Sequence, residues 1–524
     1  MKIVTSAEMR EIDRLTTEQH RIPSLTLMEN AGTAVARFIF RQYPEAKRIS
    51  VICGKGNNGG DGFVAARKLH EAGKEVTTVL LAASEDVKGD AEKMLKLLPE
   101  PAACVREPQQ AYATADFVEK ADVIVDAIFG TGFRPPLPEL AATAIEAINR
   151  AKAPVISVDV PSGIDSNSFA LEQPRVCRSD AIVTFTAPKP AIVFGAITSG
   201  PIVVADIGSP GNLVSSNLGI AWNGPATILT ASRRLNSNKG LYGHVLIIGG
   251  SRGKSGAPTM ASMAALRIGA GLATCALPAS ILPIVAGSIP ELMTESLAET
   301  TSGRLAHAAL QEDALAPILE RKTVVALGPG LGRDPETVEG VKSFVASCYL
   351  PLVIDADGLN AFEGAANLLN GSKRMLVLTP HPGEMARLIG KGVKEIEANR
   401  IEIARQFARE HGLILVLKGW RTLIADPQGQ IWVNTTGNPG LAKGGSGDVL
   451  TGMIAGMIAQ YPEQIAEAVR AAVYLHGLAA DCALATQTER TMLATDVIAA
   501  FARALRLTLR PDEFTWIQGG AQHQ

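Results

Sequence analysis

The chain of 524 residues has 47% hydrophobic and 19% charged side chains, a formal net charge of −2 and six cysteines. This balance is typical of a folded protein, and the weak negative charge argues against general binding to nucleic acid or to a membrane surface. The cysteines are scattered without a C-x-x-C pair, so neither a disulfide framework nor a zinc site is expected. Charged residues occupy the start of the chain and no run reaches the ~20 apolar residues of a membrane helix, which predicts a cytoplasmic protein.

The first part of the chain alternates short apolar runs with amphipathic stretches. A parallel sheet covered by helices on both faces is therefore predicted. The alternation ends in a segment rich in Gly, Ser, Asn and Pro at 209–242, so we expect a domain boundary near 215–235 and two separable halves. The predicted strands are 50–54, 75–82, 122–130, 154–163, 181–187 and 201–208, and the predicted helices are 63–73 and 138–152.

A second alternating series follows the boundary and predicts a second α/β domain. The two halves share an architecture but not a sequence, so they are not repeats. We place the domains at residues 1–220 and 229–510. The predicted strands of the second are 244–250, 323–332, 351–360, 374–385, 413–420 and 430–435, and its predicted helices are 258–271, 449–460 and 466–484.

Residues 54–59 read GKGNNG after an apolar run and satisfy G-x-G-x-x-G, the dinucleotide-binding fingerprint. Two features oppose a dehydrogenase. Asp61 places a carboxylate at the start of the following helix, where a pyrophosphate needs free N–H groups, and no acidic residue follows the next strand. We expect this loop to contact a ligand in another pose.

Three predicted strand ends carry Asp with Gly or Pro: NNGGDG (57–62), DAIFGTG (126–132) and DVPSGID (159–165). Any one of them could be a helix cap or a tight turn, but three at successive strand ends indicate a site. Asn58, Asp126 and Ser162 would supply hard oxygen ligands for an alkali or alkaline-earth ion. Asp159 ends an apolar strand, where partial desolvation makes it a candidate general acid or base.

These three motifs, in this order, resemble the NAD(P)H-hydrate epimerase domain over roughly residues 1–220. The resemblance implies a Rossmann-like three-layer domain that acts on a damaged dinucleotide as substrate. It also implies a potassium ion on Asn58, Asp126 and Ser162, with Asp159 touching the substrate. The implied substrate-binding residues are Asn57, Asn58, Gly59, Gly60, Asp61, Gly130, Thr131, Gly132, Phe133, Arg134, Pro135 and Pro136.

The second half contains one misleading pattern and one informative one. GGSRGKS (249–255) is no phosphate-binding P-loop, because three residues instead of four separate Gly249 from Gly253. The informative stretch is 438–456, where glycines precede a long apolar helix and Asp448 lies at its start. Free N–H groups there favour a transferred phosphate, so Asp448 is either a general base beside it or a plain helix cap.

The motifs KGLYGHVLIIGGSRGKSGAP, GPGLG, DADGLN, TPHPGEMARL, LKGWRT and GGSGDVLTG resemble the ribokinase-like superfamily. Within it they are most similar to the ADP-dependent NAD(P)H-hydrate dehydratase domain, over about 229–510. In a reaction of this kind we assign Asp448 as the catalytic base that deprotonates the substrate hydroxyl. The implied ADP-binding residues are Lys418, Gly419, Trp420, Arg421, Thr422 and Gly447, and the implied contacts to the hydrated dinucleotide are Ala257, Gly330, Gly332, His381 and Asp448.

Both halves together resemble the bifunctional nicotinamide nucleotide repair family. The expected substrates are hydrated NADH and NADPH with ADP as co-substrate, and the expected products of dehydration are the reduced dinucleotide, AMP and phosphate. Potassium is expected in the first domain and magnesium in the second, and the protein is expected to be a homo-oligomer. Three alternatives stay open: a ribokinase-like small-molecule kinase with an accessory nucleotide-binding domain, a non-catalytic first half, and an NAD-dependent dehydrogenase.

Overall fold

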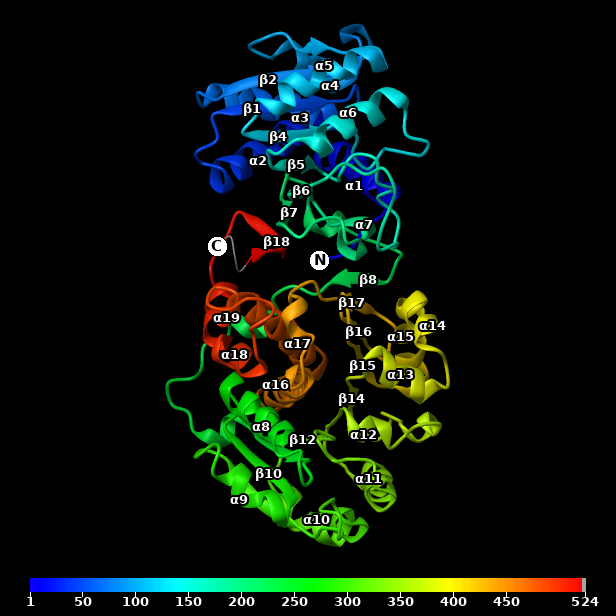
Figure 1. Ribbon diagram of the computed structural model, residues 1–524, viewed down its shortest axis with the longest axis vertical. Coiled ribbons are helices and arrows are strands. Elements are labelled where there is room, and N and C mark those ends of the chain that lie inside the picture. Colours follow the sequence, from blue (N-terminus) through cyan, green and yellow to red (C-terminus); the bar gives the residue numbers. More distant parts are fainter. Residues whose placement is uncertain (521–524) are drawn as a thin grey trace. The chain divides into compact units, whose positions relative to one another are not determined.

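A computed structural model describes residues 1–520, and residues 111–114 by their backbone alone. The chain forms two compact units (Figure 1). The first unit contains Met1–Trp222 together with the residues from Pro511 onward, and the second contains Asn223–Arg510. No helix in the described part of the chain is long and apolar enough to cross a membrane.

The first unit is built on a mostly parallel sheet whose strand order is β18-β7-β6-β5-β4-β1-β2-β3. Its central strands are buried along almost their whole length, as expected for strands with helices on both faces. The strands are β1 (Arg48–Cys53), β2 (Glu75–Leu80), β3 (Ala103–Cys104), β4 (Val123–Ala127), β5 (Val155–Val158), β6 (Ala181–Phe185), β7 (Ile202–Ala205) and β18 (Phe514–Gln518).

One predicted helix boundary in this unit is wrong. The helix expected at 63–73 is α3 (Asn57–Glu71), which begins six residues earlier, inside the glycine motif. Asp61 is therefore the fifth residue of the helix and lies beyond its first turn. The glycines permit this start because Gly59 and Gly62 let the helix approach the loop at Gly54 and the side chains of β1 and β4 more closely than a Cβ would allow.

The remaining helices of the first unit surround this sheet, with α2 packed against α3. They are α1 (Ser6–His20), α2 (Ser24–Gln42), α4 (Gly89–Lys96), α5 (Pro108–Glu119), α6 (Glu139–Arg150) and α7 (Pro190–Phe194). Helix α1 begins with a capping box, in which the Thr5 hydroxyl accepts from the Glu8 N–H and the Glu8 carboxylate accepts from Thr5.

The sheet of the first unit is completed by a strand from the far end of the chain. Strand β18 pairs antiparallel with β7. Phe514 packs edge-on against Phe38 of α2 with ring centroids 5.9 Å apart, and Asp512 accepts two 2.8 Å hydrogen bonds from Arg41. The sequence pattern did not predict this strand, because the whole second unit separates it from the rest of the first unit along the chain.

The second unit contains a larger sheet with the order β11-β10-β9-β12-β13-β14-β15-β16-β17. Neighbours from β11 to β15 are parallel, and β15, β16 and β17 are antiparallel. The strands are β9 (His244–Ile248), β10 (Leu272–Pro278), β11 (Met293–Leu297), β12 (Val324–Leu327), β13 (Leu352–Ile354), β14 (Leu376–Leu378), β15 (Ile414–Leu417), β16 (Leu423–Ala425) and β17 (Ile431–Val433).

Two helices of small residues dominate one face of this sheet. Helix α16 (Ser446–Gln460) packs against α8 (Gly256–Ile268), and Gly452 and Gly456 let it approach the backbone of Ala261 and Ala265. The other helices are α9 (Leu282–Ala286), α10 (Glu312–Leu319), α11 (Pro335–Ser347), α12 (Asp357–Asn360), α13 (Pro382–Ile389), α14 (Val393–Ala398), α15 (Arg400–His411), α17 (Ile465–Ala483), α18 (Ala494–Ala499) and α19 (Phe501–Thr508). The predicted class of two α/β domains with mainly parallel sheets is confirmed.

Candidate active sites

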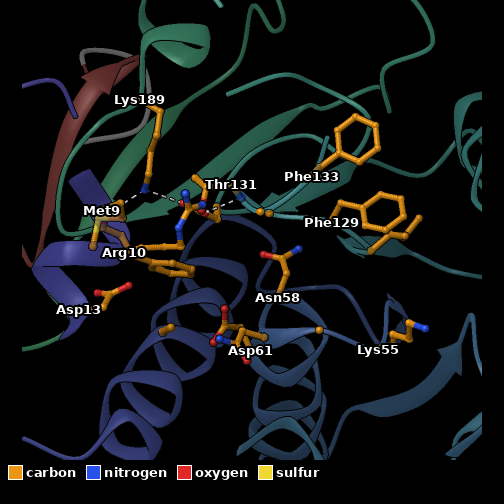
Figure 2. Close-up of a pocket in the computed structure, with 18 of the residues that line it drawn as sticks. Met9, Arg10, Asp13, Lys55, Asn58, Asp61, Phe129, Thr131, Phe133 and Lys189 are labelled. Carbon is orange, nitrogen blue, oxygen red and sulfur yellow. Dashed lines mark hydrogen bonds and ion pairs between the residues drawn. The ribbon is translucent and has the colours of Figure 1, made fainter. Parts of the chain in front are cut away.

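The first unit has a pocket of about 640 Å³ at the carboxyl ends of its parallel strands, a volume that suits a small-molecule ligand (Figure 2). Helix α1, the start of α3 and the loop after β4 provide most of its walls. The pocket is lined by nine of the predicted residues, Asn57, Asn58, Asp61, Gly130, Thr131, Gly132, Phe133, Arg134 and Pro136, together with Asp159. Gly59, Gly60 and Pro135 are not part of this lining; Gly59 and Gly60 are buried within α3.

Asp159 is held by a buried lysine that the sequence analysis did not single out. Lys189 Nζ lies 2.6 Å from Asp159 Oδ1, and the Thr184 hydroxyl donates to the same oxygen at 2.8 Å. Lys189 is only 1% exposed and lines the same pocket. The backbone of Asp159 has φ +65°, a strained value for a residue with a side chain, and such strain recurs at functional positions. A cation directly after the apolar run 181–187 was the available sequence signal.

Asp126 and Ser162, two of the predicted metal ligands, are in direct contact. The Ser162 N–H donates to Asp126 Oδ2 at 2.8 Å and its hydroxyl donates to Oδ1 at 2.5 Å. Burial raises the pKa of Asp126, and the Ser162 hydrogen bonds partly offset this. The third, Asn58, is 9% exposed and its Nδ2 has no hydrogen-bond partner in the described structure. Asn58 Oδ1 and Asp159 Oδ2 both approach Gly130, where a Cβ would lie 2.8 Å and 3.3 Å from them.

Three exposed cations line this pocket. Arg10 from α1, Lys55 before α3 and Arg134 line it. Helix α3 has no side-chain cap, so the N–H groups of its first turn are available to an anion. Because Asp61 lies one turn further along, its carboxylate does not occupy the end of the helix. These groups could bind the phosphates of a dinucleotide.

Two further carboxylates, Asp13 and Asp61, also line the pocket. Burial raises the pKa of Asp13 to about 6, with Lys189 lowering it and Asp159 raising it. Burial also raises the pKa of Asp61 well above its usual range, and Asp159 and Asp13 add to the effect. Asp13 was not among the predicted site residues, because a single acid on the polar face of an amphipathic helix gives no distinguishing signal.

In the second unit, a charged cluster lies where β13, β15 and α16 meet. Lys418 Nζ lies 2.8 Å from Asp355 Oδ1 and 3.9 Å from Glu384 Oε2. The Thr451 hydroxyl of α16 donates to Asp355 Oδ2 at 2.6 Å. Burial opposes a charge on Lys418, but Asp355 and Glu384 raise its pKa. Gly447 adjoins this cluster, since a Cβ there would lie 3.4 Å from Lys418 Nζ.

Asp448 stands at the third position of α16 beside this cluster. Its carboxylate makes no hydrogen bond or ion pair within the described residues, and α16 has no side-chain cap. This geometry opposes the helix-cap alternative, in which the carboxylate would accept from the first backbone N–H groups. Burial and the nearby Asp355 raise the pKa of Asp448 to about 7, with Lys418 lowering it. A carboxyl group with this pKa can accept a proton at neutral pH.

Three of the predicted dinucleotide contacts of the second unit, Ala257, Gly330 and Gly332, lie at one glycine loop or against it. Gly330 lies against Ala257, since a Cβ built on Gly330 would be 3.3 Å from the Ala257 Cβ. The Gly332 N–H donates to Asp357 Oδ2 at 2.8 Å. Lys254 forms a 3.0 Å ion pair with the same Asp357. Burial alone would raise the pKa of Asp357, but the Gly332 N–H and Lys254 outweigh it, so the pKa is lowered.

His381, the remaining predicted dinucleotide contact, caps α13. Its Nδ1 accepts from the Gly383 N–H at 3.0 Å and from the Glu384 N–H at 3.3 Å. Burial lowers the pKa of His381, and Lys418 lowers it further, so the ring is neutral at pH 7. Its side chain is 51% exposed, so the ring can still contact a ligand.

The predicted ADP-binding segment 418–422 joins β15 to β16. The Arg421 guanidinium lies 4.2 Å from the centroid of the Trp420 ring and donates to the Thr435 carbonyl at 3.1 Å. The Thr422 hydroxyl donates to the Gly419 carbonyl at 3.3 Å. Trp420 is 48% exposed, which leaves an aromatic surface for a base to stack on.

Comparison with known families divides the chain into the same two parts. A family model described as NAD(P)H-hydrate dehydratase matches residues 245–503, and one described as the N-terminus of YjeF-related proteins matches residues 24–191. The fold and the sites thus define a two-domain α/β enzyme class in which a YjeF-related domain precedes an NAD(P)H-hydrate dehydratase domain.

Full-length relatives make the family specific. The chain is 44% identical to the bifunctional NAD(P)H-hydrate repair enzyme Nnr of Moorella thermoacetica, with 97% of each chain covered. It is 35% identical to the enzyme of the same name from Escherichia coli, covering 91% of this chain and 88% of the relative. The chain therefore belongs to the family of bifunctional NAD(P)H-hydrate repair enzymes. A solved ADP/ATP-dependent NAD(P)H-hydrate dehydratase from Bacillus subtilis is 33% identical, covering 53% of this chain and 94% of its own, with a TM-score of 0.47.

Proposed function

We propose that the protein repairs hydrated NADH and NADPH: the first unit interconverts the two hydrate epimers, and the second dehydrates the S epimer with ADP. The observation that carries the second activity is the free carboxylate of Asp448 at the start of α16, beside the Lys418–Asp355 pair. Membership of the bifunctional repair family supports both activities.

The second site fits phosphoryl transfer to a hydroxyl. Water added across a reduced nicotinamide leaves a hydroxyl, which is a poor leaving group. Asp448 removes the hydroxyl proton as the oxygen attacks the terminal phosphate of ADP. The uncapped N–H groups of α16 and the Lys418 ammonium then stabilise the transferred phosphate. Elimination of phosphate restores the reduced ring, so the products are the dinucleotide, AMP and phosphate.

A magnesium ion would neutralise charge on the ADP phosphates in this site. In the described part of the chain, no group of three or more His, Cys, Asp or Glu side chains is placed to hold a metal ion. The phosphates of the nucleotide and water molecules would therefore supply most ligands of the magnesium ion, as is usual for magnesium. We place ADP on residues 418–422 and Gly447, and the hydrated dinucleotide on Ala257, the loop 330–332 and His381.

The first site fits the epimerisation of a hydroxyl-bearing ring carbon next to a nitrogen. Asp159 is the catalytic carboxylate, with Oδ1 bound by Lys189 and Oδ2 directed towards Gly130 at the pocket wall. A potassium ion would be held by oxygens of Asn58, Asp126 and Ser162. A buried carboxylate with amide and hydroxyl oxygens fits a hard monovalent cation, which would keep Asp126 ionised and fix the loop that lines the pocket.

The test is incubation of the full chain with a mixture of both hydrate epimers and ADP. Recovery of the reduced nicotinamide absorbance beyond the fraction of the S epimer, with release of AMP and phosphate, is the expected result. Accumulation of a stable phosphorylated dinucleotide would instead indicate a kinase. Recovery of the S fraction alone, followed by the uncatalysed rate, would show that the first unit has no epimerase activity.

A further inference from the structure

The pocket of the first unit contains more acid than its predicted residues require. Its titratable and charged lining consists of Arg10, Asp13, Lys55, Asp61, Arg134, Asp159 and Lys189. Lys189 forms a 2.6 Å ion pair with Asp159. Asp13 and Asp61 form no ion pair within the described residues.

Asp13 lines the pocket with an oxygen that is free to interact with a ligand. Its Oδ1 is buried and has no hydrogen-bond partner in the described structure. It projects from α1, whereas Asp61 comes from α3, and Figure 2 shows both on the side of the pocket away from Lys189. A desolvated carboxylate without a donor costs stability, so such an arrangement is kept at functional positions.

The reaction of this unit requires proton transfer on two faces of one carbon. When the hydroxyl leaves, it takes a proton from an acid on its own face and departs as water, while the ring nitrogen supplies electrons and forms a C=N bond. A water molecule on the opposite face then loses a proton to a base and forms the new C–O bond. In the reverse direction the two groups exchange roles, so each face needs one group that serves as acid and as base.

We propose, on the basis of the function assigned above, that Asp13 and Asp61 form the second proton-transfer group of the epimerase site and act on the face opposite Asp159. This pair of acids supplies one exchangeable proton at the pocket wall. It donates that proton to the leaving hydroxyl of one epimer, while Asp159 accepts the proton of the entering water. For the other epimer the same groups act in reverse.

The electrostatics of the pocket agree with a proton-transfer role for these two acids. Two desolvated carboxyl groups in one pocket do not both ionise readily, and Asp13 is among the groups that raise the pKa of Asp61. Burial, with Asp159 and Asp13, raises the pKa of Asp61 well above its usual range, and burial raises the pKa of Asp13 to about 6. Environments that push two carboxyl pKa values apart are the usual mark of an acid and base pair.

The test uses Asp13→Asn in the full chain, with Glu11→Gln as the matched control. Glu11 lies on the same helix and is exposed, so its variant removes an acid from α1 outside the pocket. With mixed epimers and ADP, the Asp13→Asn protein should dehydrate the S epimer at the wild-type rate. Its conversion of the R epimer should be at least ~10²-fold slower, as expected for loss of a proton-transfer group. Asp61→Asn should give the same separation of the two phases.

Two measurements separate chemistry from folding. Asp13→Asn removes a buried charge without a donor, so its Tm should equal or exceed that of the wild type, and binding of intact NADPH to the first unit should persist. The wild-type epimerisation rate should change with pH around 6, and this dependence should be absent in Asp13→Asn. An Asp13→Asn protein that epimerises within threefold of the wild type would overturn the proposal. If the wild type itself leaves the R epimer unconverted, the epimerase function fails and not the assignment of Asp13 alone.

Discussion

Lys418 Nζ lies 2.8 Å from Asp355 Oδ1, and Thr451 donates to the second oxygen of the same carboxylate at 2.6 Å. Asp355 is 1% exposed and has both oxygens occupied by these partners, whereas Asp448 nearby has neither. Of these two acids of the cluster, Asp355 is therefore a structural carboxylate and Asp448 a free one.

The free carboxylate should be the base of dehydration. Asp448→Asn is expected to lower the dehydration rate by ~10²–10⁴-fold, because the side chain keeps its shape but loses its ability to accept a proton. ADP binding, measured by calorimetry, should persist. Asp313→Asn, on the exposed side of α10, is the control and should retain the wild-type rate. An Asp448→Asn protein with most of its turnover would exclude this residue as the base.

The same residue predicts a pH dependence of dehydration. A base acts in its ionised form, and burial beside Asp355 raises the pKa of Asp448 to about 7. The rate should therefore rise with pH through about 7 and fall tenfold for each pH unit well below that value. Rates of S-epimer dehydration between pH 5 and 9, at saturating ADP, test this. A flat profile across pH 7 would contradict the assignment.

The Lys418–Asp355 pair should contribute to stability as well as to nucleotide binding. Lys418→Met leaves a buried carboxylate without its cation and should lower the free energy of unfolding by ~3–5 kcal/mol. The double variant Lys418→Met with Asp355→Asn should recover much of this loss, because no buried charge remains. Denaturant unfolding of the single and double variants measures the coupling. If the loss of stability in the double variant equals the sum of the losses in the two single variants, the two side chains are not coupled.

Ala356 offers a test of backbone strain between two site residues. It has φ +49° and ψ −121°, a conformation that a residue with a Cβ avoids, and it separates Asp355 from Asp357. Ala356→Gly should raise stability by up to about 2 kcal/mol, since relief of ~1–3 kcal/mol of strain exceeds the greater entropy of glycine in the unfolded chain. Ala361→Gly, at an ordinary helical φ of −61°, should instead destabilise the protein. Thermal unfolding compares the two, and a loss in both would mean that Ala356 is not strained.

Asp159→Ala should remove epimerisation while leaving dehydration of the S epimer untouched, because the two sites share no catalytic group. With mixed epimers and ADP, the variant should convert the S fraction at the normal rate and then slow to spontaneous exchange. Lys189→Met should behave similarly, since it removes the partner of Asp159. Full conversion in one phase by Asp159→Ala would make it a turn residue only.

Much of both sites follows from the rule that ligands gather at the carboxyl ends of parallel strands. Asn58, Asp126 and Asp159 could be grouped in this way because each lies at or shortly after the end of an apolar run; Asn58 and Asp159 line one pocket, whereas Asp126 is fully buried against Ser162. Asp13 could not be found, because it approaches that pocket from a helix that precedes the sheet in the sequence. The start of α3 was placed six residues late because glycine reads as a turn, although close packing against β1 selects it here.

The pairing of β18, the last strand of the first unit, could not be predicted from the local sequence, for a different reason. Nothing in FTWIQ (514–518) tells whether its partner is a neighbour in the sequence or β7, some 300 positions earlier. The expectation that the two halves fold as separate fragments must therefore be revised. A fragment ending at residue 220 lacks β18, and a fragment 229–524 contains β18 without the sheet to which it belongs.

The pairing of β18 with β7 also sets an order of events during protein synthesis. Domains generally fold as they emerge, with the N-terminal one first. Here the first unit cannot close its sheet until residues 514–518 have been translated, which is after the entire second unit. Its apolar edge at β7, and the Phe38 surface that receives Phe514, stay uncovered for that interval. A ribosome that stalls in the second half thus releases a chain whose first half is also incomplete, and whose exposed strand edge invites chaperone binding or proteolysis.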